Sequence, residues 1–226
     1  MRDIEKSLML STKIYDKANK SDFFFSDPKT DLQVGIYLNS SIYIVFRGTD
    51  SLEDVTYDLT FEKTKFDTNY LYDQKEDDSK IHKGFHDQLF KSKIYQDFFD
   101  KTMEILNSRP FTRVYITGHS LGGALATIFG YVLSKYTYKF ITVHSFASPK
   151  IGDRKWKCNF KNRHNLHLTR VIVSSDPVPL FPIFNYYHIN NNVLKLDTNY
   201  YFYNLGSHSI DKYSKLMKKI KLKKCY

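Results

Sequence analysis

The sequence predicts an α/β fold with a mostly parallel central sheet, helices covering the sheet and an antiparallel hairpin at one side. Short β-rich runs alternate along the chain with stretches whose apolar residues recur at helical spacing. The 226 residues, 42% of them hydrophobic, are enough for one domain with a sizeable core. We therefore expect a single domain over residues 1–226, with a basic tail over residues 212–226.

The first half of the chain begins with an amphipathic stretch. Apolar side chains at roughly helical spacing predict a helix over residues 3–19. Two β-rich runs, 32–38 and 42–46, are separated by the turn-prone pair Asn39 and Ser40, and this pattern predicts the hairpin.

Between the hairpin and the next strand we expect three segments. Residues 50–61 predict a short helix, and the charged stretch 62–80 predicts a solvated loop. Apolar positions recur at helical spacing from 85 to 107 and predict one long helix, which Pro110 ends.

The second half supplies the parallel strands. Residues 114–117 predict a strand that leads into a strongly apolar helix ending near residue 136. Buried strands are expected at 141–146 and 168–173, with a polar helix or loop over 153–166 between them.

The charge distribution argues against a nucleic-acid partner. The net charge is +10, but residues 212–226 hold seven lysines and no acid, which leaves +3 for the rest. Lysines far outnumber arginines, whereas base recognition relies on arginine. No nucleic acid is therefore expected as a partner.

A reactive serine is indicated by the sequence Gly118-His119-Ser120-Leu121-Gly122, which has G-x-S-x-G spacing. A strand that turns sharply into a helix leaves no room for side chains beside the serine, so both flanking positions favour glycine. The alternative is a glycine-rich helix start used only for packing.

A serine nucleophile needs a base, and the base needs a group that orients it. For this turn the acid and then the histidine follow the serine in the chain. Asp176 leaves a β-rich run and precedes Pro177, a placement that Asp153, Asp197 and Asp211 lack. His208, on an expected loop after Gly206, is favoured as the base over His188, which lies in an aromatic run that predicts a strand.

An oxyanion hole requires two backbone N–H groups. Leu121 follows the serine and supplies the first. Thr49 is predicted to supply the second, because Arg47-Gly48-Thr49 leaves the earlier strand at a glycine.

Seven strings in order along most of the chain resemble the fungal-type class 3 lipase family, within the α/β-hydrolases. They are IVFRGT (44–49), DLTF (58–61), HKGF (82–85), ITGHSLGGALA (116–126), FASPKIGD (146–153), SSDPVPLFP (174–182) and GSH (206–208). The resemblance implies an α/β-hydrolase fold, Ser120 as nucleophile, Asp176 as triad acid, His208 as base, and Thr49 with Leu121 as the oxyanion hole. It also implies a short lid helix over residues 50–58. A mechanism through these residues needs no cofactor, and none is expected.

The expected lid carries only three large apolar residues, Leu52, Val55 and Tyr57, so we expect little interfacial activation. The two cysteines, Cys158 and Cys225, and the absence of an apolar leader or a spanning run predict an intracellular protein, either soluble or peripherally membrane-bound. N-glycosylation sequons at Asn19 and Asn39 leave a secreted protein as the alternative.

The expected activity is hydrolysis of acyl esters of lipids, either acylglycerols or phospholipids. An esterase or thioesterase acting on small soluble substrates, a peptidase, and a non-catalytic membrane or protein-binding module on the same scaffold are the alternatives. No metal is expected, because His82 and His86 lack the glutamate of the HExxH motif.

The basic tail has two interpretations. Its apolar residues recur on one helical face, while most of the lysines lie on the other. The face either packs on the core and leaves the lysines solvated, or the lysines hold the protein on anionic membrane. The apolar residues are Tyr213, Leu216, Met217 and Ile220, and the lysines are Lys212, Lys215, Lys218, Lys219, Lys221, Lys223 and Lys224.

Overall fold

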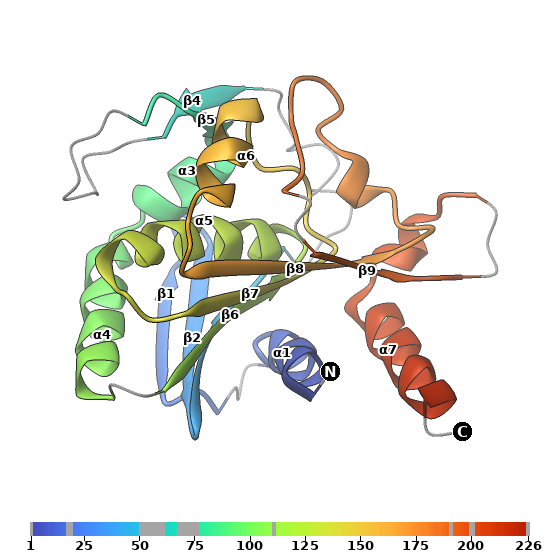
Figure 1. Cartoon of the computed structure of the whole chain (residues 1–226), viewed down its shortest axis with the longest axis horizontal. Coiled ribbons are helices and arrows are strands. Elements are labelled where there is room, and N and C mark those ends of the chain that lie inside the picture. The colour runs from blue at the N-terminus through green and yellow to red at the C-terminus, as the bar shows by residue number, and fades with distance from the viewer. Residues whose placement is uncertain are drawn as a thin grey trace.

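A seven-stranded sheet forms the centre of the fold (Figure 1). The computed structural model describes residues 2–16, 20–49, 62–66, 77–109, 112–189, 192–198 and 202–224. The strands are β1 (Phe23–Asp27), β2 (Leu32–Leu38), β3 (Ser41–Phe46), β4 (Lys63–Lys65), β5 (Lys80–His82), β6 (Arg113–His119), β7 (Ile141–Phe146), β8 (Leu166–Val173) and β9 (Asn192–Leu196). The helices are α1 (Arg2–Lys13), α3 (Lys83–Phe90), α4 (Tyr95–Ser108), α5 (Leu121–Tyr136), α6 (Arg154–Lys161), α7 (Ile210–Lys224) and the 3-10 helices η2 (Val178–Leu180) and η3 (Leu205–His208).

Strand order and direction confirm the predicted fold class. The order across the sheet is β1-β2-β3-β6-β7-β8-β9. The first three strands are antiparallel, and the predicted hairpin is the β2–β3 pair, in which Leu38 lies opposite Ile42. From β3 onward all neighbours are parallel, so five strands bring their carboxyl ends to one edge. Sites in such sheets lie at that edge.

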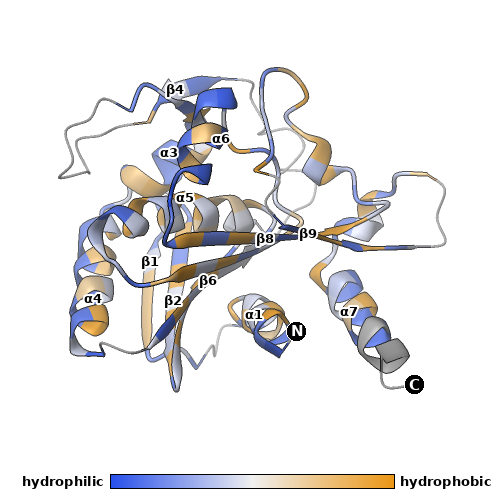
Figure 2. Cartoon of the chain, in the orientation of Figure 1, coloured by the Kyte–Doolittle hydropathy of each residue, from blue (hydrophilic) through white to orange (hydrophobic). Residues whose placement is uncertain are grey.

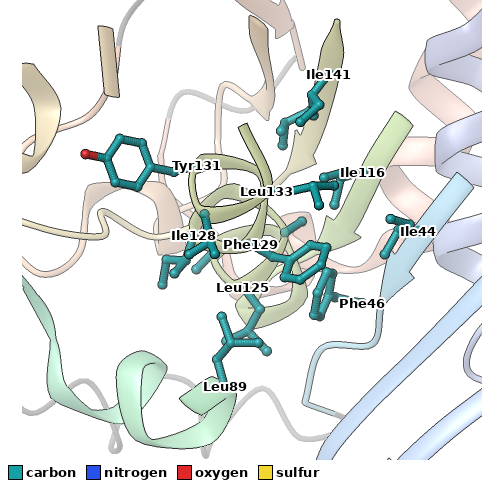
Figure 3. Close-up of a cluster of buried hydrophobic side chains, with 14 of the residues drawn as sticks. Ile44, Phe46, Leu89, Ile116, Leu125, Ile128, Phe129, Tyr131, Leu133 and Ile141 are labelled. Atoms are coloured by element: carbon teal, nitrogen blue, oxygen red, sulfur yellow. The ribbon is translucent and has the colours of Figure 1, made fainter. Parts of the chain in front are cut away.

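One face of the sheet carries the main core. Apolar side chains at alternate positions of β3 and β6, including Ile44 and Ile116, point toward α5 (Figure 3). Helix α5 is hydrophobic and buried nearly all round, because it lies between the sheet and the outer helices. Leu89 of helix α3 packs against this cluster on the side of α5 that faces away from the sheet (Figure 3).

The opposite face is covered by the two terminal helices, α1 and α7 (Figure 1). The alternate residues of β3 and β6, such as Tyr43 and Tyr115, pack there against Leu10 and Ile14. Helix α7 packs beside α1 through Tyr213 and Met217, whereas its lysines 215, 218 and 219 are exposed. The amphipathic character of α7 is visible in Figure 2. The described part of the predicted apolar face, Tyr213, Leu216 and Met217, therefore packs on the core.

The single long helix predicted over residues 85–107 is wrong, because α3 and α4 occupy this stretch with a break between them. Asp27, at the end of β1, accepts hydrogen bonds from the Ser92 hydroxyl at 2.8 Å and the Lys93 N–H at 3.1 Å. A continuous helix would need the Lys93 N–H for its own backbone ladder. The Asp27 carboxylate therefore takes the place of the helical acceptor at the break.

Other boundaries differ from the predictions. Helix α1 ends at Lys13 rather than at residue 19. The predicted loop over 62–80 contains β4, which pairs with β5 in a second, two-stranded sheet. Strands β1 and β9 were not predicted, and the short helix predicted over 50–61 lies outside the described residues. Within the described part of the chain, no helix is long and apolar enough to span a membrane.

Candidate active site

Ser120 lies at a sharp turn between β6 and α5. Its φ of 57° and ψ of −126° are strained for a residue with a side chain. The turn is held by the Ser120 N–H, which donates to the Phe146 carbonyl at 2.9 Å, and by the Ser120 carbonyl, which accepts from Gly123 at 2.9 Å. Strain of this kind at a strand-to-helix serine is the geometry of a nucleophile elbow.

A continuous chain of hydrogen bonds joins Ser120, His208 and Asp176. His208 Nε2 lies 2.8 Å from Ser120 Oγ, and His208 Nδ1 lies 2.9 and 3.1 Å from the two carboxylate oxygens of Asp176. All three side chains are buried. Because a carboxylate only accepts, Nδ1 is the protonated donor, and Nε2 is left to accept the Ser120 hydroxyl proton.

The three residues of this hydrogen-bond network come from three separate segments of the fold. Ser120 comes from the β6–α5 turn, Asp176 from the turn after β8, and His208 from the end of η3. The Asp176 Oδ1 atom also accepts from the Val178 N–H at 3.0 Å, and Oδ2 accepts from the Tyr213 hydroxyl at 2.7 Å. The carboxylate is thus held from both sides.

His119, which is not among the predicted site residues, supports His208. Its Nε2 donates to the backbone carbonyl of His208 at 2.8 Å, and the two ring centroids are 4.8 Å apart. Burial lowers the pKa of His119 to about 3, so the ring is neutral near pH 7. The motif position between Gly118 and Ser120 was the only sequence signal for it.

The two residues predicted for the oxyanion hole belong to neighbouring segments. Leu121 is the first residue of α5, where helix geometry provides no intrahelical acceptor for its N–H. Thr49 follows Gly48, and a Cβ atom on Gly48 would lie 2.4 Å from the His119 carbonyl and 3.4 Å from the Gly122 nitrogen. The loop after β3 therefore lies against the serine turn.

Tyr15 holds that loop from the other side of the sheet. Its hydroxyl accepts a hydrogen bond from the Gly48 N–H at 3.1 Å. The Gly48 N–H is therefore occupied, and Thr49 is the next backbone donor along the loop. Tyr15 is a second residue that is not among the predicted site residues, because its partner is 33 residues away in the chain.

The rival residues lie elsewhere. His188 Nε2 donates to the Pro179 carbonyl at 2.5 Å, and burial lowers the pKa of His188 to about 3. His188 lies outside β9, so the strand expected there is wrong. Asp153 caps α6 by accepting from the Trp156 N–H at 2.8 Å. Asp197 follows β9 and Asp211 lies in the first turn of α7.

His82 caps α3 through its Nδ1, which accepts from the Gly84 N–H at 3.1 Å. Among the described residues, no group of three or more His, Cys, Asp or Glu side chains is able to hold a metal ion. The lid residues Leu52, Val55 and Tyr57 lie outside the described residues.

A serine at a strand-to-helix turn of a mostly parallel sheet, followed in the chain by an aspartate and a histidine, defines an α/β-hydrolase. Residues 43–186, more than half of the chain, match the family model Lipase (class 3). The chain therefore belongs to the class 3 lipase family.

The chain is similar in sequence to curated relatives and in fold to solved structures. The chain is 27% identical over 146 residues to a lipase of Rhizopus niveus, an alignment covering 63% of this chain and 35% of that protein. It is 25% identical over 200 residues to phospholipase A1-IIbeta of Arabidopsis thaliana, covering 76% and 48%. The structure of a triacylglycerol lipase from Penicillium expansum superposes with a TM-score of 0.74 at 20% identity, covering 87% and 78%. The chain thus spans about a third to a half of the length of these curated relatives.

Proposed function

We propose that this protein is a serine ester hydrolase that cleaves acyl esters of lipids, acylglycerols or phospholipids, through Ser120, His208 and Asp176. The observation that carries the proposal is the buried hydrogen-bond chain, with 2.8 Å between Ser120 and His208 and 2.9 Å between His208 and Asp176. Each member has the partner that its role requires.

The reaction proceeds in two halves. Ser120 Oγ attacks the ester carbonyl while His208 Nε2 takes its proton, and the same proton then passes to the departing alcohol. This leaves an acyl group on Ser120. Water, activated by His208, attacks the acyl-enzyme and releases the fatty acid. Asp176 holds the Nδ1–H and stabilises the imidazolium that forms in each half.

The developing oxyanion needs fixed donors. In this proposal the backbone N–H groups of Leu121 and Thr49 supply them, and Tyr15 helps to fix the loop that carries Thr49. No cofactor takes part in these steps.

Exposed apolar side chains support a lipid substrate. They lie on the segment that follows Asp176 in the chain and on the segment that precedes His208. Such side chains favour contact with acyl chains over contact with water. They are Leu180, Ile183, Phe184, Phe202, Tyr203 and Leu205.

Location and membrane contact belong to the proposal as well. Cys158 is a free, exposed cysteine, and a free thiol is typical of a reducing compartment. An intracellular location is proposed on this basis. The exposed lysines of α7 are proposed to contact anionic membrane, in addition to the packing of its apolar face.

A turnover panel tests the proposed function. Wild type and Ser120→Ala are compared on acylglycerols, phospholipids and short soluble esters, with the fold of the variant checked by circular dichroism. We expect lipid ester hydrolysis by the wild type alone. Wild-type turnover by a folded Ser120→Ala protein contradicts the mechanism, and turnover confined to short esters contradicts the lipid substrate.

A further inference from the structure

Tyr213 of the terminal helix α7 contacts the candidate active site directly, although it lies outside the residues that match the family model. The side chain is fully buried. Its hydroxyl donates to Asp176 Oδ2 at 2.7 Å and accepts from the Val173 N–H at 3.1 Å. One hydroxyl therefore joins the end of β8 to the carboxylate that follows it.

These two bonds are not explained by packing alone. The apolar face of α7 requires only a large side chain at position 213, and phenylalanine would meet that need. The hydroxyl satisfies the buried Val173 N–H and adds a donor to the Asp176 carboxylate, and an unmade hydrogen bond at either atom is costly. The polar atom thus has a function separate from the ring.

The Asp176 carboxylate has few ways to turn while these donors are present. Oδ1 accepts from Val178, Oδ2 accepts from Tyr213, and both oxygens face His208 Nδ1. Loss of the Tyr213 hydroxyl removes one of the two donors to Oδ2 and leaves only His208 Nδ1, which lies 2.9 Å from Oδ2 and 3.1 Å from Oδ1. The orientation of the imidazole then depends on a looser carboxylate.

The ring of Tyr213 contacts the other support of His208. It meets the His119 ring edge-on, with centroids 5.6 Å apart, and His119 donates to the His208 backbone. Burial and the neighbouring Asp176 raise the pKa of Tyr213 well above its ordinary value, so the hydroxyl stays a neutral donor. Helix α1 packs against α7 through Leu8, which fixes α7 in place.

We propose that Tyr213 is a positioning residue that fixes the Asp176 carboxylate, and through it His208, so that α7 is a working part of the active site. This inference rests on the proposed function for its kinetic consequences. Its geometric consequence, the orientation of the imidazole, is independent of any substrate.

The experiment compares Tyr213→Phe with Tyr131→Phe, a matched control. Tyr131 is also buried, and its hydroxyl also donates to a buried carboxylate, Asp77 Oδ2, at 2.8 Å. Both variants lose the same chemical group, but only one of them touches the hydrogen-bond chain of Ser120. Kinetics on a short soluble ester are combined with proton NMR of the His208 Nδ1–H, which reports its bond to Asp176.

For Tyr213→Phe we expect kcat to fall about tenfold with KM unchanged, because the acyl site is intact but the base is misaligned. The Nδ1 proton resonance moves or broadens. Tyr131→Phe retains kcat and the resonance. Wild-type kcat together with an unchanged resonance in a folded Tyr213→Phe protein overturns the proposal.

Two further outcomes separate the inference from the proposed function. If the wild type hydrolyses no ester, the proposed function fails, but a displaced resonance in Tyr213→Phe still supports the positioning role. If Tyr213→Phe does not fold, 3,5-difluorotyrosine at position 213 replaces it, because this residue keeps the hydroxyl and makes it a stronger donor. A shifted Nδ1 resonance then supports the proposal, and an unchanged one overturns it.

Discussion

A Cβ atom on Gly118 would lie 2.3 Å from the carbonyl carbon and oxygen of Gly122. No atom of the two residues is able to move far, because Gly118 belongs to β6 and Gly122 to the first turn of α5. Among the described glycines none has a positive φ, and the positive φ at this turn belongs to Ser120. The motif needs glycine here for close approach and not for backbone freedom.

Gly118→Ala is therefore expected to destabilise the protein by about 3 kcal/mol, since overpacked backbone cannot relax as a side chain does. Gly84→Ala is the control, because its Cβ would meet only the His82 ring, at 3.1 Å. Urea denaturation of both variants measures the difference. Equal free energies of unfolding would show that the turn tolerates a methyl group.

Alanine substitutions of His208 and His188 distinguish a histidine that acts in catalysis from one that stabilises the fold. His208→Ala is expected to lower kcat by about 10³ or more, because the proposed base is lost. His188→Ala is expected to keep kcat and lose about 1–3 kcal/mol of stability, because the buried Pro179 carbonyl loses its donor. Kinetics and thermal unfolding of both variants check this, and an inactive His188→Ala protein beside an active His208→Ala protein would reverse the assignment.

Stability is expected to fall as the pH drops below 6.5. Burial lowers the pKa of His144 to about 4 and that of His119 and His188 to about 3, from an ordinary value of 6.5. Between pH 6.5 and 4 these histidines are protonated in the unfolded chain but largely neutral in the native state. The free energy of unfolding therefore decreases with falling pH. Above pH 6.5 these groups contribute no pH dependence.

The substitution His144→Gln tests the contribution of one of these histidines. His144 Nδ1 lies 2.8 Å from the hydroxyl of Ser7 in α1. Removing one such histidine is expected to reduce the slope by about 1.4 kcal/mol per pH unit near pH 5. Denaturation curves at pH 7, 6 and 5 measure the slope. An identical slope in the variant would mean that His144 is protonated in the native protein.

The lysines of α7 are expected to strengthen binding to anionic vesicles, at about 1 kcal/mol each near the surface at low salt. The test variant changes Lys218, Lys219, Lys221, Lys223 and Lys224 to Gln and keeps the buried Tyr213 and Met217. We expect weaker sedimentation with the vesicles, a flatter salt dependence and unchanged hydrolysis of a short soluble ester.

A charge-matched control changes five lysines elsewhere, each exposed: Lys29, Lys65, Lys93, Lys161 and Lys195. It is expected to bind vesicles more strongly than the α7 variant. Equal binding by the α7 variant and the wild type at low salt would eliminate the membrane role and leave α7 as a packing helix.

The sequence predicted the fold where local pattern and long-range packing agree. Strands β2, β3, β7 and β8 are mostly buried, so each is visible in the sequence as a short β-rich apolar run. The break between α3 and α4 was missed because apolar spacing continues across it, while Asp27, 65 residues from Ser92, interrupts the backbone. Strand β9 was missed because four of its five residues are not buried.

In the candidate active site, too, the residues marked by a local sequence pattern were predicted and those held by long-range contacts were not. Ser120, Asp176 and His208 were predicted from their order in the chain, and Ser120 and Asp176 also from their place after strands. The supporting residues were not: His119 meets the His208 backbone 89 residues away, and Tyr213 meets Asp176 37 residues away. Tyr213 was noted only as a member of an apolar face, because a pattern of hydropathy does not show what a hydroxyl will bind.

The identity of the nucleophile is tested most directly by a phosphonyl fluoride, which loses fluoride when an activated serine hydroxyl attacks its phosphorus. Peptide mass spectrometry then locates the adduct. We predict one adduct per chain on the peptide that contains Ser120, none in Ser120→Ala, and much slower labelling in His208→Ala. Labelling at another residue, or equal labelling rates in the wild type and His208→Ala, would contradict the account.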